Sequence, residues 1–397
     1  MKTILSSRIH HYLAIVSIFL ITVALIAGMV GCGGTSAQYS LSVSSTSGGN
    51  VTHPGIGTFT YPAGAVVLLE AEPANGYSFV NWSGNVSTIV DVNSPTTTIT
   101  MNGHYFITAN FAYGKLIQTW YDLDAIKDNL DDNYTLMGSL DSTTPGYEEL
   151  ASPTANQGQG WQPIGTYNAT FTGAFDGQGY EIKDMFINRP EEWGIGLFGF
   201  VGEGGVVKYI GVVNATVTGR GRVGGLVGDN DQGTVTDSYT TGSVTGGVVG
   251  NGTAGGLVGF NWWGTVSNSY STATVTGSSG AGGLVGLNDG TVSDSYATGN
   301  VTGEWEVGGL VGYNYAGTMS NSFWDTETSG QSTSAGGTGK NTTEMQDIAT
   351  FTDTETEGLD EPWDIITVGG PGTRNLLYIW NIVDDETYPF LSWQPVS

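Results

Sequence analysis

The sequence predicts an all-β protein: a small N-terminal β-domain, then a right-handed parallel β-helix with a short capping helix and an aromatic C-terminal cap. Two observations predict this fold. Between residues 39 and 112, short apolar–polar alternations are broken by Gly, Pro and Asn, as in strands joined by turns. Further on, Gly-Gly-Leu-Val-Gly recurs at spacings of 31, 27 and 26 residues, beginning at Gly224, Gly255, Gly282 and Gly308. Units of this length bury an apolar face only when they stack, so a solenoid is expected.

Composition narrows the classes of function. The chain has 397 residues, with Lys+Arg 11 against Asp+Glu 37 and a formal net charge of -26. Nucleic acid is excluded as a partner, because binding to phosphates needs clustered basic residues. The single cysteine, Cys32, allows no intrachain disulfide and no thiolate metal cluster. A hydrophobic fraction of 39% is enough to build packed cores.

Residues 1–31 are expected to be a signal peptide or membrane anchor, and residues 32–38 a linker. An uncharged apolar run over residues 12–30 is long for a signal peptide and nearly long enough to span a bilayer. It ends in Met29-Val30-Gly31-Cys32, which resembles the lipobox of bacterial lipoproteins and implies lipidation of Cys32. An uncleaved helical anchor and ordinary secretion are the alternatives. The expected partner is the membrane, through the lipid or the helix, with the bulk of the chain outside the cytoplasm.

Residues 39–112 are expected to fold as a small β repeat domain. The segments Tyr61-Pro62-Ala63-Gly64, Gly76-Tyr77-Ser78-Phe79, Trp82-Ser83-Gly84 and Ala109-Asn110-Phe111 resemble the bacterial surface repeat domain related to internalin B-repeats. The resemblance implies a spacer that holds another domain away from the cell surface.

The Gly-Leu-Val-Gly repeats resemble the GLUG motif of bacterial and archaeal surface proteins, and with their flanks cover about residues 116–397. We expect an N-terminal cap over residues 116–160, with a short helix suggested by Leu123, Ile126 and Leu130. The β-helix follows over residues 161–327, then a flexible loop over 328–345. Residues 346–397 are expected to cap the C-terminal end, because a bare β-helix end exposes a strand edge.

Matching positions in each coil predict its interior. Leu, Val and Tyr are expected to form stripes inside the coil, and glycines to occupy corners with positive φ. Alternation places Val235, Asp237 and Tyr239 on one strand face. The equivalent residues are expected to stack as an interior ladder in which each Asn donates to a neighbouring Asp: Asp237, Asn268, Asp294 and Asn321. The alternatives are a corner that faces water and, third, a catalytic cluster of Asp side chains.

The sequence contains further candidate sites. Four aromatic residues in or near the turns could stack on sugar rings, although edge packing against adjacent turns explains them as well: Trp262, Trp263, Trp305 and Tyr313. The acidic stretch from Asp122 to Asp132 matches no EF-hand loop, so Ca²⁺ is conceivable but unsupported, and no cofactor or metal ligand set is expected. The sequence contains no His-Glu-x-x-His and no phosphate-binding loop, so no catalytic residue is predicted.

Two functions are compatible with these features. The first is an envelope-anchored, non-enzymatic surface protein that is adhesive or structural, with an extracellular glycan or protein as ligand. The second is a polysaccharide-processing β-helix enzyme that uses acidic residues. Convergence of three or more carboxylates in one groove would favour the enzyme.

Overall fold

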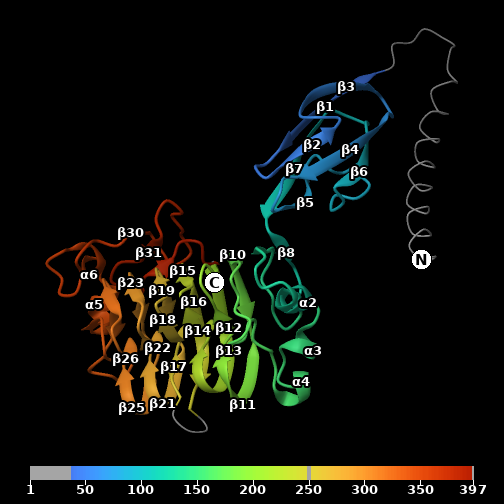
Figure 1. The fold of residues 1–397 in the computed structure, drawn as a ribbon. Helices are drawn as coiled ribbons and strands as arrows, with labels where there is room; N and C mark the ends of the chain where they lie inside the picture. The colour runs from blue at the N-terminus through green and yellow to red at the C-terminus, as the bar shows by residue number, and fades with distance from the viewer. Residues whose placement is uncertain (1–36, 248–251, 396–397) are drawn as a thin grey trace, which may run out of the picture.

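A computed structural model describes residues 37–247 and 252–395 of the chain and confirms the all-β architecture (Figure 1). A small β-domain is followed by a stack of parallel strands, and each part has its own hydrophobic core. Cys32 lies outside the described residues.

The N-terminal domain is built from two small sheets around one core. One sheet has the order β3-β1-β7-β5 and contains β1 (Gln38–Ser45), β3 (Gly57–Pro62), β5 (Tyr77–Gly84) and β7 (Tyr105–Tyr113). The other has the order β2-β4-β6 and contains β2 (Gly49–His53), β4 (Val66–Pro73) and β6 (Thr96–Thr100). Leu41, Leu69 and Ile99 are fully buried between them. Trp82 is also a core residue, 2% exposed, and its Nε1 donates to Ser94 O at 3.1 Å.

Short helices cover the start of the solenoid. They are α2 (Trp120–Asp124), the 3-10 helix η1 (Ala125–Asp128), α3 (Tyr147–Leu150) and α4 (Ala155–Gly158). Thr119 and Asp122 form a capping box at the start of α2, which satisfies backbone donors of the first turn. Leu123 and Ile126 are fully buried, as the predicted capping helix requires. β8 (Lys115–Ile117), which precedes α2, and β9 (Tyr134–Leu136), which follows η1, already pair in parallel, so the stack starts inside the expected cap.

Each of the three coils that follow the entry strands contains four short strand segments, and the last described coil contains three. The entry strands are β10 (Ala174–Lys183), β11 (Phe186–Ile195), β12 (Phe198–Val201) and β13 (Val206–Gly224). The next coils contain β14 (Val227–Asp231), β15 (Thr234–Thr236), β16 (Tyr239–Thr245) and β17 (Ala254–Gly255); β18 (Val258–Trp262), β19 (Thr265–Ser267), β20 (Tyr270–Ser271) and β21 (Thr274–Gly282). The last contain β22 (Val285–Asn288), β23 (Thr291–Ser293), β24 (Tyr296–Ala297) and β25 (Val301–Gly308); β26 (Val311–Asn314), β27 (Thr318–Ser320) and β28 (Phe323–Asp325). Equivalent strands pair in parallel and in register.

The leucine of each repeat lies in the interior, as predicted. The four side chains have no exposed surface: Leu226, Leu257, Leu284 and Leu310. Their backbones are hydrogen-bonded from coil to coil, for example Leu257 N to Leu284 O at 2.9 Å. The repeat motif therefore places one leucine directly above the next.

The repeat glycines are required for a different reason from the one predicted. The first glycine of each motif has no positive φ. A Cβ atom at Gly224 or Gly282 would instead lie 2.1 or 1.9 Å from the carbonyl oxygen of the valine three residues later. No side chain fits that approach, so the glycine permits tight packing of the bend rather than a left-handed corner.

The tyrosine stripe lies outside the coil interior, which corrects the prediction. Tyr239, Tyr270 and Tyr296 stack with centroids 5.0 and 4.9 Å apart and planes 2° apart, and Phe323 continues the row. This aromatic stack belongs to a separate core that it shares with residues 341–395, here called the lateral segment. The segment contains α5 (Thr342–Gln346), α6 (Ala349–Thr352), β30 (Ile365–Thr367), β31 (Trp380–Ile382) and β32 (Phe390–Leu391). It therefore covers the side of the solenoid (Figure 1).

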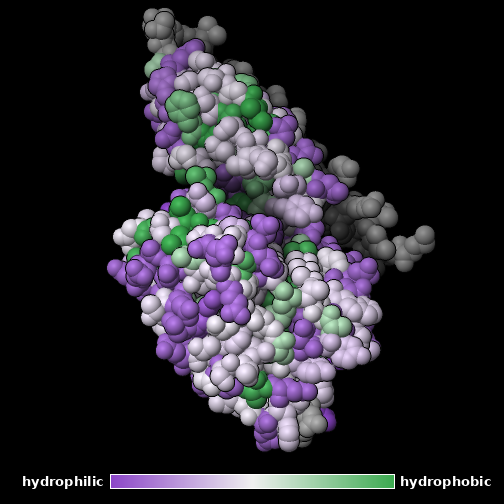
Figure 2. Space-filling view, turned by 90° about the vertical axis from the view of Figure 1, so that its left-hand side faces the viewer, coloured by the Kyte–Doolittle hydropathy of each residue, from purple (hydrophilic) through white to green (hydrophobic). Residues whose placement is uncertain are grey.

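The end of the last coil is covered by residues 329–340 instead. Val301 N donates to Ser329 O at 3.0 Å, and Val311 N donates to Ser334 Oγ at 2.9 Å. This stretch ends in β29 (Thr338–Lys340), which pairs in parallel with β28. Part of the segment expected to be a flexible loop therefore caps the edge. Its residues are partners for backbone groups of the last coils that would otherwise be unpaired. Figure 2 faces this end and shows a mixed surface with scattered hydrophobic residues.

Candidate ligand-binding groove

A column of side chains crosses one sheet of the solenoid at a single register position. The sheet has the order β12-β14-β18-β22-β26, and the column consists of Phe200, Asp229, Phe260, Leu287 and Tyr313. The first four line adjoining pockets of about 200, 280 and 180 Å³. They form the floor of what we call the groove.

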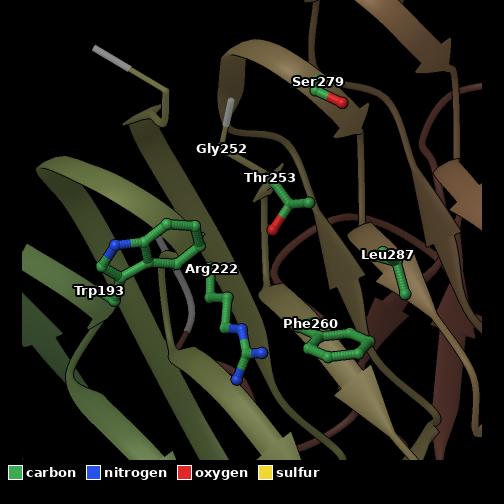
Figure 3. Close-up of a pocket in the computed structure, with 7 residues that line it drawn as sticks. All are labelled: Trp193, Arg222, Gly252, Thr253, Phe260, Ser279 and Leu287. Atoms are coloured by element: carbon green, nitrogen blue, oxygen red, sulfur yellow. The ribbon is translucent and has the colours of Figure 1, made fainter. Parts of the chain in front are cut away.

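Exposed aromatic side chains stand around this floor. Tyr167 is 76% exposed and makes an edge contact with Phe200 at 6.1 Å. Trp262 makes an edge contact with Phe260 at 5.3 Å, and Trp263 lies 5.7 Å from Trp262. Trp193 lies across the pocket from Phe260 (Figure 3). The rim therefore combines residues from the loop before β10, from β11 and from the end of β18.

Arg222 and Asp229 form an ion pair inside the groove. The guanidinium also lies 4.9 Å from the centroid of Phe260, as a cation–π contact. Asp229 is 3% exposed, and burial raises its pKa to about 6 although Arg222 pulls the pKa down. Its Oδ1 has no hydrogen-bond partner among the described residues. The floor thus holds a polar pair with unused hydrogen-bonding capacity.

Two of the four aromatic residues predicted to stack on sugars lie in this groove. Trp262 and Trp263 line the same pocket as Asp229. Tyr313 continues the floor beyond Leu287 and is half-buried. Trp305 is 70% exposed on β25 and lines none of the three pockets.

Sequence reasoning missed the floor of the groove and three further contributors, namely Tyr167, Trp193 and Arg222. Tyr167 and Trp193 precede the regular repeats, where the pattern gives no register. Arg222 directly precedes the Val-Gly-Gly of the first regular repeat, and the residues at that register in the next coils are Thr253 and Gly280. The signal available in the sequence was that Arg222 differs from the residues at the same register in the next two coils.

The predicted Asp–Asn ladder is not an interior ladder. All four positions are left-handed corners, with φ of 48° at Asp237, 46° at Asn268, 49° at Asp294 and 45° at Asn321. Asn and Asp are the non-glycine residues that tolerate this conformation best. One contact of the expected type is present, from Asn321 Nδ2 to Asp294 Oδ1 at 3.2 Å, but Asp237 accepts from Thr236 instead. The corner part of the alternative therefore accounts for the pattern, but these corners do not all face water, because Asp237 and Asn321 are each only 8% exposed.

A true asparagine ladder lies elsewhere in the repeat, six residues after its first glycine. The amides of Asn230, Asn261 and Asn288 each donate to the Asn of the next coil, at 2.8, 2.9 and 3.0 Å, and the last acceptor is Asn314. Asn230 and Asn261 also donate to the carbonyl three residues on. The ladder stops at Asn230, because the preceding coil has Val201 at that register.

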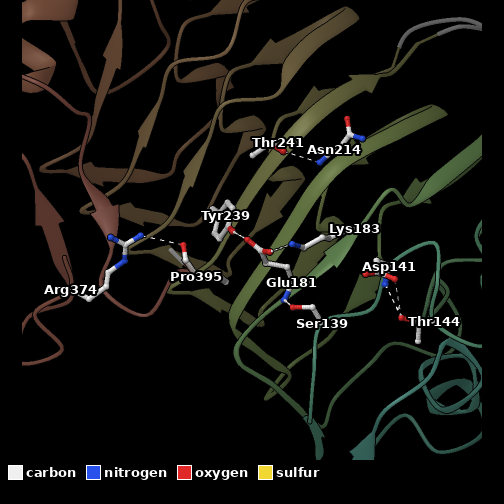
Figure 4. A network of polar contacts seen from close by, with 10 residues as sticks. All are labelled: Ser139, Asp141, Thr144, Glu181, Lys183, Asn214, Tyr239, Thr241, Arg374 and Pro395. Atoms are coloured by element: carbon white, nitrogen blue, oxygen red, sulfur yellow. Dashed lines mark hydrogen bonds and ion pairs between the residues drawn. The ribbon is translucent and has the colours of Figure 1, made fainter. Parts of the chain in front are cut away.

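Other buried acids are committed to structural contacts. Glu181 accepts from the Tyr239 hydroxyl and pairs with Lys183 at 2.6 Å (Figure 4). Asp325 is fully buried; burial pushes its pKa up, but hydrogen bonds from Tyr388 and Thr342 hold that pKa below its ordinary value. Within residues 37–247 and 252–395, no group of three or more His, Cys, Asp or Glu side chains is placed to hold a metal ion.

Comparison with known families defines the class of both parts. Residues 39–115 match the divergent InlB B-repeat domain, and residues 219–245, 250–276 and 277–302 match the GLUG motif. The chain therefore carries a divergent InlB B-repeat domain followed by a parallel β-solenoid with GLUG repeats. None of the helices in the described part is long and apolar enough to cross a bilayer.

Individual relatives are matched only over part of their length. The chain is 32% identical to halomucin of Haloquadratum walsbyi over 241 residues, which is 57% of this chain and 2% of that protein. It is 35% identical to a candidate Gly-rich membrane protein of Evansella cellulosilytica over 118 residues, 29% of this chain and 13% of that protein. A crystal structure of a candidate immunoglobulin A1 protease from Bacteroides ovatus aligns over 71% of this chain and 93% of that chain, with 18% identity and a TM-score of 0.47. That likeness is too low to carry an argument about function.

Proposed function

We propose that this chain is an envelope-anchored, non-enzymatic surface protein whose solenoid acts as an adhesive or structural scaffold. The observation that carries the proposal is that two buried acids outside the groove make contacts within the fold. Glu181 and Asp325 are bonded within the fold, whereas the open face is an aromatic groove rather than a carboxylate cluster. The similarity to halomucin and to a protein named for the membrane supports a surface location.

Attachment to the membrane is proposed to occur through lipidation of Cys32. Two acyl chains hold a protein stably, whereas one holds it weakly. In cells that produce the chain, a palmitate analogue should label the wild type and not the Cys32→Ser variant. Equal labelling of both would assign the anchor to the apolar run over residues 12–30. Protection of the chain from protease added outside intact cells would overturn the surface location.

A polysaccharide-processing enzyme is the second candidate, favoured by the presence of Asp229 and Asp231 in one pocket. Glycoside hydrolysis needs an acid and a second carboxylate on either side of the scissile bond. Asp229 is 3% exposed and is paired with Arg222, so it is poorly placed to protonate a leaving group. Release of reducing ends from a polysaccharide by the purified chain, lost in Asp231→Asn, would establish the enzyme and overturn the non-enzymatic proposal.

A further inference from the structure

We propose that the groove bounded by Tyr167, Trp193, Arg222, Trp262 and Trp263 binds a neutral, hydroxyl-rich oligosaccharide. This inference deepens the proposed surface function and rests on it. The relevant surface is the series of three pockets over β12, β14, β18 and β22.

The rim offers apolar platforms to a ligand. Trp263, Trp193 and Tyr167 are 65%, 46% and 76% exposed, although they surround a floor in which Phe200 and Phe260 are each 7% exposed. Large aromatic rings with one free face suit ligands that have an apolar side and a polar edge. The CH-rich faces of pyranose rings have this character.

The floor offers the complementary polar groups. Arg222 uses Nη1 for Asp229, and no described residue accepts from its remaining donors. Asp229 Oδ1 lacks a donor among the described residues, and Asp231 and Gln232 line the same pocket. A hydroxyl group both donates and accepts, so sugar hydroxyls would accept from the free Arg222 donors and donate to Asp231, which lines the same pocket.

The charges select a neutral ligand over an acidic one. The pocket walls carry Asp229, Asp231 and Glu192 against Arg222. Arg222 is already paired with Asp229, and Glu192 is paired with Arg189 at 2.9 Å. Arg220, whose guanidinium lies 5.6 Å from the centroid of the Trp193 ring, offsets the charge of Asp231, so the groove itself is close to neutral. The chain as a whole carries -26, so a uronate or sulfated chain would be repelled.

The dimensions favour an oligosaccharide over a single sugar. Each pocket has at most about 280 Å³, which is just below the usual range for a site that encloses a small molecule. The pockets adjoin, however, since Arg222 lines the first two and Trp193 lines the first and third. A ligand would gain contacts by extending across several rungs, which are about 4.8 Å apart.

The test measures binding of defined oligosaccharides to the full chain purified in detergent. The probes are the neutral hexasaccharides of β-1,4-glucose, β-1,4-xylose and β-1,4-mannose, with hexagalacturonate as the acidic comparison. Trp263→Ala and Trp193→Ala alter the rim at exposed positions. Tyr121→Ala is the matched control, because Tyr121 is a 51% exposed aromatic residue of α2 that lines none of the three pockets.

At least one neutral hexasaccharide should bind, and each tryptophan variant should weaken its binding by at least about tenfold while Tyr121→Ala leaves it unchanged. Failure of all three neutral probes, or a preference for hexagalacturonate, would overturn the inference. Equal affinities in the wild type and the tryptophan variants would place the site elsewhere. None of these results bears on surface location, which the protease and Cys32 labelling experiments decide separately.

Discussion

Asp229, on the floor of the groove, makes the stability of the fold depend on pH. Its pKa is raised to about 6 by burial, so the folded state holds this proton more tightly than the unfolded state. The contribution to stability is therefore fully present below the unfolded pKa of about 4 and is lost as pH rises through about 6. A shift of about two pKa units corresponds to roughly 3 kcal/mol.

The first prediction follows from that shift. Asp229→Asn removes the titration but keeps a side chain able to accept from Arg222. Between pH 4 and pH 7, the free energy of unfolding of the wild type should fall relative to that of the variant by up to about 3 kcal/mol. Urea unfolding at both pH values measures the difference. Parallel pH profiles of the two proteins would show that Asp229 is not perturbed.

The corner residues give a second prediction at the residue scale. Asp294 has φ 49°, where a β-branched residue is strained and glycine is not. Asp294→Gly and Asp294→Val both remove the acceptor used by Asn321, so comparing them isolates the backbone effect. Asp294→Val should be less stable than Asp294→Gly by about 1–2 kcal/mol in thermal or urea unfolding. Equal stabilities would mean that this corner adapts to the side chain.

The same corner explains why the interior ladder was mispredicted. Alternation along one strand would place Val235, Asp237 and Tyr239 on one face. The left-handed residue at Asp237 ends β15 and starts a new direction at β16, so the valine points into the coil core and the tyrosine into the lateral core. A preference of Asp and Asn for such corners was available in the sequence and was the better guide.

At the scale of elements, the lateral segment stabilises a side of the solenoid that would otherwise expose aromatic rings. Trp380 is fully buried at its centre, and its ring centroid lies 5.8 Å from that of Tyr296 and 5.0 Å from that of Trp363.

Trp380→Ala should lower the free energy of unfolding by about 3–5 kcal/mol. Leu377→Ala is the matched control: this residue of the same segment is 88% exposed, and its truncation should change stability by less than about 0.5 kcal/mol. Similar losses in both variants would argue against a lateral core.

Elements differed in how far the sequence alone could predict them. Recurrence of the motif around Leu226 and its equivalents was sufficient for the coil register, because a motif that occurs once per coil stacks on its copies even where the segments between them differ in length. The aromatic stack was not predictable in the same way, because a stripe of Tyr buried inside a coil and a stripe buried beneath a second layer have the same period in the sequence.

The edge cap was missed because residues 329–340 are rich in Ser, Thr and Gly. Loops share this composition with irregular backbone that pairs with a coil end. The groove combines repeat and non-repeat segments, so only Trp262 and Trp263 on its rim and Tyr313 beyond its floor could be predicted.

At the scale of the whole molecule, the B-repeat domain and the solenoid have cores without a shared residue. One core contains Trp82 and Leu69, and the other contains Leu284 and the other repeat leucines. Polar contacts cross the junction between them, for example from Asn133 Nδ2 to the Tyr113 hydroxyl at 3.0 Å. Two cores joined mainly by such contacts should unfold as separate cooperative units.

Calorimetry of the full chain should therefore show two transitions that respond to different substitutions. Trp82→Ala should lower only one of them, since a buried tryptophan lost from a small domain costs about 3–5 kcal/mol. Leu284→Ala should lower only the other, by about 2–5 kcal/mol in free energy, because it opens a cavity in the leucine stack. Each variant serves as the control for the other. A single transition that both substitutions shift together would mean that the junction couples the B-repeat domain and the solenoid into one folding unit.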